Sequence, residues 1–162
     1  NFSELSVEHG SIIASRFADE SIEVSPAVKV AKWSGSLYFA NAAYFETKFL
    51  DLIARNNDEL KYVIVDVASI VQVDASGEQV LSGLVETCSN SGIEILFART
   101  ERLEAELFRS GFKKRFGENR FFDLRADALK FVWEELEDLA NEDDVNEDEE
   151  GLGFENAELE TS

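Results

Sequence analysis

The chain has 162 residues and a formal net charge of −19 at pH 7, and 44% of its residues are hydrophobic. This length and composition suit one globular domain with a normal core and some additional loose chain. The negative charge argues against nucleic acid as the main partner, because phosphates would be repelled. No apolar run approaches the ~20 residues that span a bilayer, and no signal-peptide pattern is present.

Histidine and cysteine, which are common in catalytic and metal sites, are scarce. His9 is the only histidine and lies in the N-terminal lead, and Cys88 is the only cysteine. A Ser-His-Asp triad or a histidine-rich metal site would need histidine on the folded core. A single cysteine gives no disulfide framework and allows a reducing compartment. We therefore expect no catalytic residues, no metal and no cofactor, and an enzyme is the least expected class.

The distribution of charge and pattern predicts three regions. Residues 1–27 form a lead or linker, in which short strands are expected over 11–17 and 21–24. Residues 28–140 form the folded domain. Residues 141–162 form an acidic tail that we expect to be disordered, because its apolar content is too low to fold alone. The chain also begins at Asn1 and lacks methionine, so we expect it to be part of a longer protein, although removal of a tag would give the same observation.

The first clear pattern predicts a hairpin. Residues 28–33 alternate between apolar and polar, which predicts a strand with one wet face. Residues 34–36 read as a turn, and residues 37–39 return in extended form. We therefore expect an antiparallel hairpin at the edge of the sheet.

Two helices with a buried strand between them are predicted next. Asn41 is the expected cap of the first helix, whose inward face holds Phe45, Phe49, Leu52 and Ile53. Residues 62–67 are β-branched and aromatic, which predicts a strand buried on both faces. The second helix begins near Ser76 and stops at residues 89–92. Its inward residues are Val80, Leu81, Leu84, Val85 and Cys88.

The remaining patterns complete an α/β arrangement. We expect a strand over 93–98, a short helix containing Leu103 and Leu107 that stops at Gly111, and a short strand over 120–122. A last amphipathic helix is marked by Leu129, Val132, Trp133, Leu136 and Ala140. The predicted fold class is α/β, with a small mixed β-sheet, an opening antiparallel hairpin and about four helices.

Five short motifs occur in order along this sequence. They are Trp33-Ser34-Gly35-Ser36-Leu37, the strand Val63 to Val67, Asp74-Ala75-Ser76-Gly77, Gly92-Ile93-Glu94-Ile95 and Ser110-Gly111-Phe112. In this order and spacing the chain resembles the STAS domain of sulphate transporters and anti-sigma factor antagonists, over roughly residues 28–140. Within that family, the segment 37–42 resembles the signature of the SulP anion transporters, in which the domain follows the membrane part.

The resemblance implies a non-catalytic regulatory and protein-interaction domain of a SulP-type transporter of sulphate or another anion. Such a domain would lie at the cytoplasmic face of the cell membrane, as a soluble domain of an integral membrane protein. Its implied partners are the transmembrane domain of the same transporter and a soluble cytosolic protein. Two alternatives remain open: a free anti-sigma factor antagonist switched by phosphorylation of Ser76, and a nucleotide-binding regulatory domain. The sequence indicates neither the transported anion nor the oligomeric state.

The first candidate site is a phospho-acceptor or partner-docking loop. Its residues are Asp74, Ala75, Ser76, Gly77 and Glu78. In the antagonists the serine or threonine before the glycine is the kinase target, although Ala75 departs from the Ser-Ser pair common there and SulP domains do not generally share this phosphosite. Ser76 and Gln79 have the spacing of a capping box, so a structural role for Ser76 as helix cap is favoured. A phosphate there would add close to −2 charge and change which partner can dock.

The second candidate site is a basic cluster facing an anion, a lipid or a nucleotide. Its residues are Arg109, Lys113, Lys114, Arg115 and Arg120. A solvated face near a helix C-terminus is favoured over contact with a nucleotide phosphate, anionic lipid or the acidic tail. Most of the large aromatic residues, namely Trp33, Tyr38, Phe39, Phe45 and Phe49, are expected in the core, with some on a docking surface.

Overall fold

The computed structural model describes residues 2–5, 26–56, 58–104 and 111–154. Strands and helices alternate as predicted, and the described part of the chain contains four α-helices. In chain order the elements are β1 (Phe2–Leu5), β2 (Val28–Ser34), α2 (Phe39–Arg55), β3 (Tyr62–Ser69), α3 (Ala75–Asn90), β4 (Glu94–Ala98), α5 (Phe112–Phe116), a 3₁₀ turn (Glu118–Arg120), β5 (Phe121–Phe122) and α6 (Arg125–Phe154). The strands expected over 11–17 and 21–24, and the helix expected around Leu107, lie outside the described residues.

One sheet contains all the described strands, in the order β1-β2-β3-β4-β5. Strands β2 to β5 are parallel to their neighbours, whereas β1 runs antiparallel to β2, with Phe2 opposite Trp33. The mixed α/β class is therefore confirmed. The predicted antiparallel hairpin of residues 28–33 and 37–39 is wrong, because residues 37–39 do not return along β2.

The chain leaves β2 in a direction that a hairpin does not allow. Gly35 adopts φ 110°, and its N–H donates to the carbonyl of Ser69 at 3.3 Å. Leu37 then forms an isolated parallel bridge with Val73. The segment after β2 thus follows the segment after β3 in the same direction. Since parallel strands need a crossover connection, helix α2 begins at once and carries the chain back to the start of β3.

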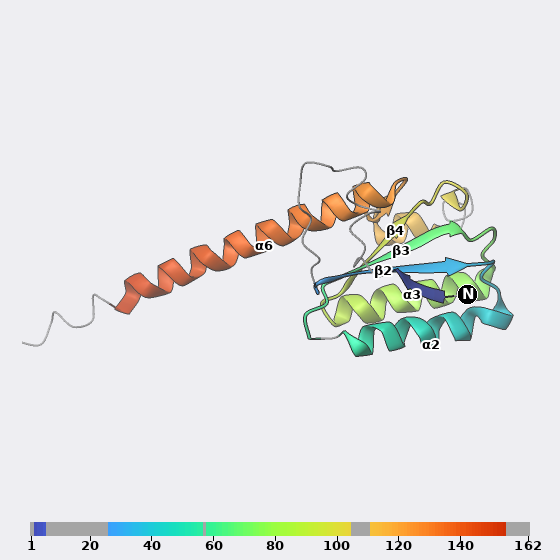
Figure 1. The fold of residues 1–162 in the computed structure, drawn as a ribbon, viewed down its shortest axis with the longest axis horizontal. Helices are drawn as coiled ribbons and strands as arrows, with labels where there is room; N and C mark the ends of the chain where they lie inside the picture. Colours follow the sequence, from blue (N-terminus) through green and yellow to red (C-terminus); the bar gives the residue numbers. More distant parts are fainter. Residues whose placement is uncertain (1, 6–25, 57, 105–110, 155–162) are drawn as a thin grey trace, which may run out of the picture. The chain divides into compact units, whose positions relative to one another are not determined.

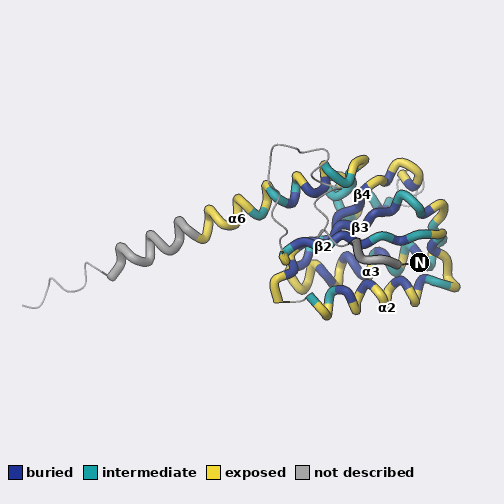
Figure 2. The backbone as a smooth tube through the Cα atoms, in the orientation of Figure 1, coloured by how far each residue is buried: buried dark blue, intermediate teal, exposed yellow. Residues whose placement is uncertain are grey.

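The main hydrophobic core lies between the sheet and helices α2 and α3, which lie side by side along one face of β2, β3 and β4 (Figure 1). The inward faces of both helices are dark in Figure 2, and their outward faces are exposed. Strand β3 is buried from Tyr62 to Val67, as predicted for a strand covered on both faces. Because side chains alternate along a strand, Val63 and Val65 join this core, and Asp66 points to the opposite face of the sheet.

The chain divides into two compact units, Asn1–Leu129 and Lys130–Ser162, and the boundary falls within α6. Along α6, Leu129 and Val132 are buried, and Trp133 and Leu136 are half-buried. The helix continues to Phe154, into the segment that the sequence predicted as a disordered tail. Glutamate is a good helix former, and an α-helix satisfies its own backbone hydrogen bonds, so a segment of low apolar content can still be helical.

Candidate docking corner at the start of helices α2 and α3

The carboxylate of Asp74 caps two helices at once. It is the N-cap of α3, where its Oδ1 accepts a hydrogen bond from the N–H of Gly77 at 2.8 Å. Its Oδ2 accepts a hydrogen bond from the N–H of Phe39, the first residue of α2, at 2.9 Å. The hydrogen bonds from Gly77 and Phe39 stabilise the ionised form and hold the pKa of Asp74 below its usual value of 3.8.

The predicted capping role of Ser76 is therefore wrong. Ser76 is the second residue of α3 and is half-buried, and the cap lies two residues earlier. The expected cap of α2 was also misplaced, because that helix begins at Phe39. Asn41 instead accepts a hydrogen bond from the N–H of Tyr38 at 2.9 Å and so satisfies a donor at the start of the helix.

Close backbone contact holds the two helix starts together. The N–H of Leu37 donates to the carbonyl of Gln72 at 3.0 Å, and the N–H of Asp74 donates to the carbonyl of Leu37 at 3.1 Å. A Cβ atom at Gly77 would lie 2.5 Å from the carbonyl oxygen of Leu37. Glycine at position 77 is thus needed for α3 to approach the segment that follows β2.

Three large exposed side chains belong to the two segments that meet at this corner. Tyr38 is 40% exposed, Phe39 is 80% exposed and Val71 is 65% exposed. Tyr38 is tied to the neighbouring segment, because its hydroxyl donates to the side-chain oxygen of Gln72 at 3.2 Å. We call Tyr38, Phe39 and Val71, together with Asp74, the docking corner. Of the five aromatic residues that the sequence predicted to be mostly core with some on a surface, Trp33, Phe45 and Phe49 are buried in the core. Tyr38 and Phe39 are the two that are exposed.

The remaining residues of the predicted loop lie on the first turn of α3. Ala75 is exposed, and Glu78 accepts a hydrogen bond from Arg115 of α5 at 3.1 Å. The structure therefore brings the candidate loop into contact with one member of the candidate basic cluster. Arg115 also donates to Ser82 at 3.4 Å, so α5 is attached to α3 along one side of that helix.

Acidic neighbours offset much of the charge of the basic cluster. Lys113 pairs with Glu104 at 2.8 Å, and Arg120 lies 3.9 Å from Glu94. Lys114 is exposed, and Arg109 lies outside the described residues. Three of the five basic side chains thus face carboxylates, which leaves less charge for an external phosphate.

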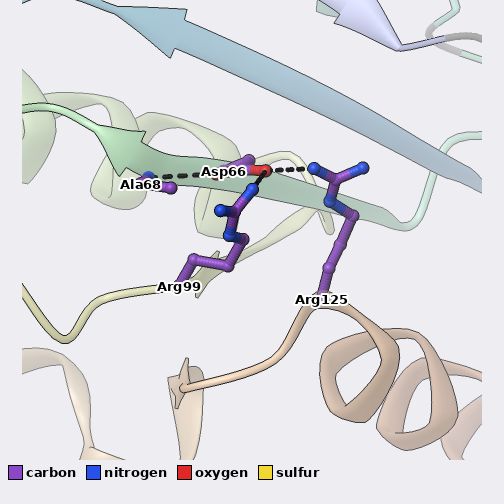
Figure 3. A network of polar contacts seen from close by, with 4 residues as sticks. All are labelled: Asp66, Ala68, Arg99 and Arg125. Atoms are coloured by element: carbon purple, nitrogen blue, oxygen red, sulfur yellow. Dashed lines mark hydrogen bonds and ion pairs between the residues drawn. The ribbon is translucent and has the colours of Figure 1, made fainter.

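One charged cluster was not predicted as a site. Asp66 is fully buried, and its carboxylate faces the guanidinium groups of Arg99 and Arg125 (Figure 3). Arg99 follows β4, and Arg125 is the first residue of α6. The three residues are far apart in the sequence. In the sequence, the only indication of this cluster is Asp66, the single charged residue in the otherwise apolar segment 62–67.

Three further features of the described residues concern metal binding, the thiol of Cys88 and the length of apolar helices. Within the described residues, no group of three or more His, Cys, Asp or Glu side chains could hold a metal ion. Burial raises the pKa of the Cys88 thiol to about 11, which keeps the thiol protonated and weakly reactive at neutral pH. None of the helices in the described ranges combines the length and apolar character needed to cross a membrane.

Comparisons with known proteins identify the family. The profile of the STAS domain matches residues 21–128. The crystal structure of a sulfate transporter family protein from Wolinella succinogenes is similar, with 26% identity, a TM-score of 0.62, and coverage of 74% of this chain and 94% of that one. A search of curated protein sequences found no match.

Two further solved structures share the fold at lower identity. The SulP transporter STAS domain from Vibrio cholerae is 21% identical, with a TM-score of 0.60 and coverage of 79% of this chain and 96% of that one. An anti-sigma factor antagonist from Mycobacterium paratuberculosis is 16% identical, with a TM-score of 0.57 and coverage of 82% and 94%. The family match covers more than half of the sequence and agrees with the observed topology, and the chain therefore belongs to the STAS domain family.

Proposed function

We propose that this chain is a regulatory, protein-binding domain of a SulP-type anion transporter. It acts without catalysis at the cytoplasmic face of the membrane. The observation that carries the proposal is the docking corner, where the carboxylate of Asp74 fixes two helix starts and the adjoining segments expose Tyr38, Phe39 and Val71. Exposed patches of this kind mark protein interaction sites. Similarity to the Wolinella sulfate transporter family protein supports the transporter assignment.

The sequence segment that resembles the SulP signature contributes directly to this surface. Residues 37–42 include Tyr38 and Phe39, and they lead into the first turn of α2. In the proposed mechanism, the transmembrane domain of the same transporter covers Phe39 and Val71, and a soluble protein competes for the same corner. Burial of one phenylalanine side chain contributes about 1.5–3 kcal/mol to such a contact.

The test compares two serine substitutions on the same helix. Phe39→Ser removes the most exposed side chain of the corner, and Leu50→Ser removes a side chain of α2 that is 39% exposed and lies about 16 Å further along the helix. Binding to the detergent-solubilised membrane domain encoded by the same gene is measured with each purified variant. We expect Phe39→Ser to weaken binding roughly 10- to 100-fold and Leu50→Ser to leave it unchanged.

Equal binding by wild type and Phe39→Ser would remove the corner as the docking site. The transporter assignment has a separate test, which is the native reading frame. A gene without long apolar spans next to this domain would overturn that assignment and leave the docking role to be tested with soluble partners.

The second candidate function is a free antagonist switched by phosphorylation. The observation that favours it is the position of Ser76, half-buried in the first turn of α3, where the helix dipole stabilises a phosphate. The carboxylates of Asp74 and Glu78 oppose that charge. Incubation with the matching kinase and ATP should give a mass increase that Ser76→Ala abolishes, and no increase would exclude this function.

The nucleotide-binding alternative has weaker support. Its basic cluster is partly neutralised by Glu78, Glu94 and Glu104. Calorimetry with millimolar nucleotide tests it, and the absence of heat would count against it.

A further inference from the structure

We infer that Arg99 and Arg125 form a binding site for a small oxyanion of the phosphate or sulfate kind. Asp66 lies within β3 on the face of the sheet opposite to the main core, Arg99 follows β4, and Arg125 lies three residues after β5, so the site does not depend on the transporter assignment. The carboxyl ends of parallel strands are the usual place for ligands in α/β sheets.

The site carries an excess of positive charge. Asp66 is fully buried, and its Oδ1 is occupied by the N–H of Ala68 at 3.0 Å. Its Oδ2 accepts from both Arg99 Nη1 and Arg125 Nη2 (Figure 3). One carboxylate thus faces two guanidinium groups. Among the described residues, Asp66 is the only side chain that either arginine contacts by hydrogen bond or ion pair.

The site also contains a buried hydrogen-bond donor without an acceptor among the described residues. Arg125 Nε is buried and has no hydrogen-bond acceptor among the described residues. Leaving such a donor without a partner is costly, and the cost is greater for a charged group. A guanidinium presents its Nε–H and one Nη–H side by side, which matches two oxygens of a phosphate or sulfate. The unused Nε of Arg125 therefore offers the recognition element that an oxyanion requires.

The exposed side chain of Arg99 gives an anion access to the site. Arg99 lies 3.5 Å from Asp66, at the limit of a hydrogen bond, and its side chain is 47% exposed. Such a contact contributes little to stability. Its backbone is fixed instead, because Arg99 adopts φ 60° and its N–H donates to the carbonyl of Phe122 at 2.8 Å. The guanidinium of Arg99 can therefore leave Asp66 for an incoming anion and open the way to Arg125, while Asp66 remains paired with Arg125.

The surroundings indicate weak, salt-sensitive binding. Asp123 and Asp127 are exposed and flank Arg125 in the sequence, so their charges lower the local positive potential. Added salt screens the attraction between an anion and the partly exposed Arg99. We therefore expect dissociation constants in the millimolar range at physiological ionic strength.

The test uses the full chain, titrated with sodium phosphate and with sodium sulfate at constant ionic strength. The Nε–H resonances of the arginines are followed by nuclear magnetic resonance, and thermal melts are recorded in parallel. We expect a saturable shift of the Arg125 Nε–H resonance and a rise in melting temperature that sodium chloride at equal ionic strength does not give. No saturable shift, or the same shift with chloride, would overturn the inference.

Two variants separate this site from a general charge effect. Arg99→Gln removes the exposed guanidinium group of the site, whereas Lys114→Gln removes one exposed positive charge on α5. We expect Arg99→Gln to weaken phosphate binding by about tenfold or more and Lys114→Gln to have no effect. Equal binding by Arg99→Gln and wild type, or loss of binding in Lys114→Gln, would refute the site.

A third titration distinguishes a nucleotide phosphate from a free inorganic anion as the ligand. Adenosine diphosphate is titrated under the same conditions. Tighter binding of the nucleotide that depends on Arg99 supports the site with a nucleotide phosphate as its ligand. Equal binding of nucleotide and inorganic phosphate supports it with the free anion as its ligand.

Discussion

Two glycine-to-alanine substitutions in α3 should have opposite effects on stability. At Gly77 the new Cβ would lie 2.5 Å from the carbonyl oxygen of Leu37 and 3.0 Å from a methyl carbon of Val73. The oxygen belongs to the backbone and already accepts a hydrogen bond from the N–H of Asp74, so it cannot move without loss. Such overpacking typically costs about 1–3 kcal/mol, and the gain in helix propensity of up to ~1 kcal/mol offsets only part of it.

Gly83 is the matched control, because it lies in the same helix and an added Cβ there has nothing within 4 Å. Gly83→Ala should stabilise the chain by about 0.5–1 kcal/mol through helix propensity alone. The measurement is urea unfolding followed by far-ultraviolet circular dichroism, with thermal melts in which 1 kcal/mol corresponds to roughly 2–4 °C. If Gly77→Ala were as stable as Gly83→Ala, the close approach of α3 to Leu37 would be refuted.

Three further outcomes follow from the same contacts. Asp66→Ala removes the buried carboxylate that pairs with Arg125, so it should lower the free energy of unfolding by about 1.5–3 kcal/mol in urea titrations, and an unchanged free energy of unfolding would contradict the ion pair. The folded pKa of Asp74 is lowered, so its stabilising contribution is complete above the unfolded pKa near 3.8 and is lost as the pH falls through the folded pKa. The stability difference between wild type and Asp74→Asn should therefore shrink from pH 5 toward pH 2, and a constant difference would refute this role. The raised pKa of the Cys88 thiol predicts negligible alkylation by iodoacetamide at pH 8 in the native chain and rapid alkylation in urea, whereas rapid native labelling would contradict its burial.

Local pattern predicted the elements whose residues are determined by burial alone. Strand β3 and helix α3 were found because their apolar residues recur with the periods of a two-sided buried strand and an amphipathic helix. The sequence also predicts that a helix begins within the segment Asp74 to Gly77, because this segment combines a turn residue with a recognisable motif.

The errors concern contacts between residues far apart in the sequence. Tyr38 and Phe39 favour extended structure locally, yet α2 begins there because its first N–H groups are satisfied by Asn41 and by Asp74, which is 35 residues from Phe39. The Asp66 cluster joins residues 33 and 59 positions apart. A single sequence contains no signal for such pairs until the order of the strands is known.

The geometry of Asp74 connects the two functions proposed for the docking corner, namely partner binding at α2 and phosphorylation at α3. Its two carboxylate oxygens are shared between Gly77 and Phe39, so the starts of α3 and α2 are held by a single group. A partner that covers Phe39 contacts a residue whose backbone position depends on this carboxylate. A charge added at Ser76, two residues from Asp74, acts on the same carboxylate through repulsion. Contact at α2 and modification at α3 are therefore alternative ways to perturb one hydrogen-bonded element, and the physical requirement for either is that Asp74 stays ionised and bridges both helices.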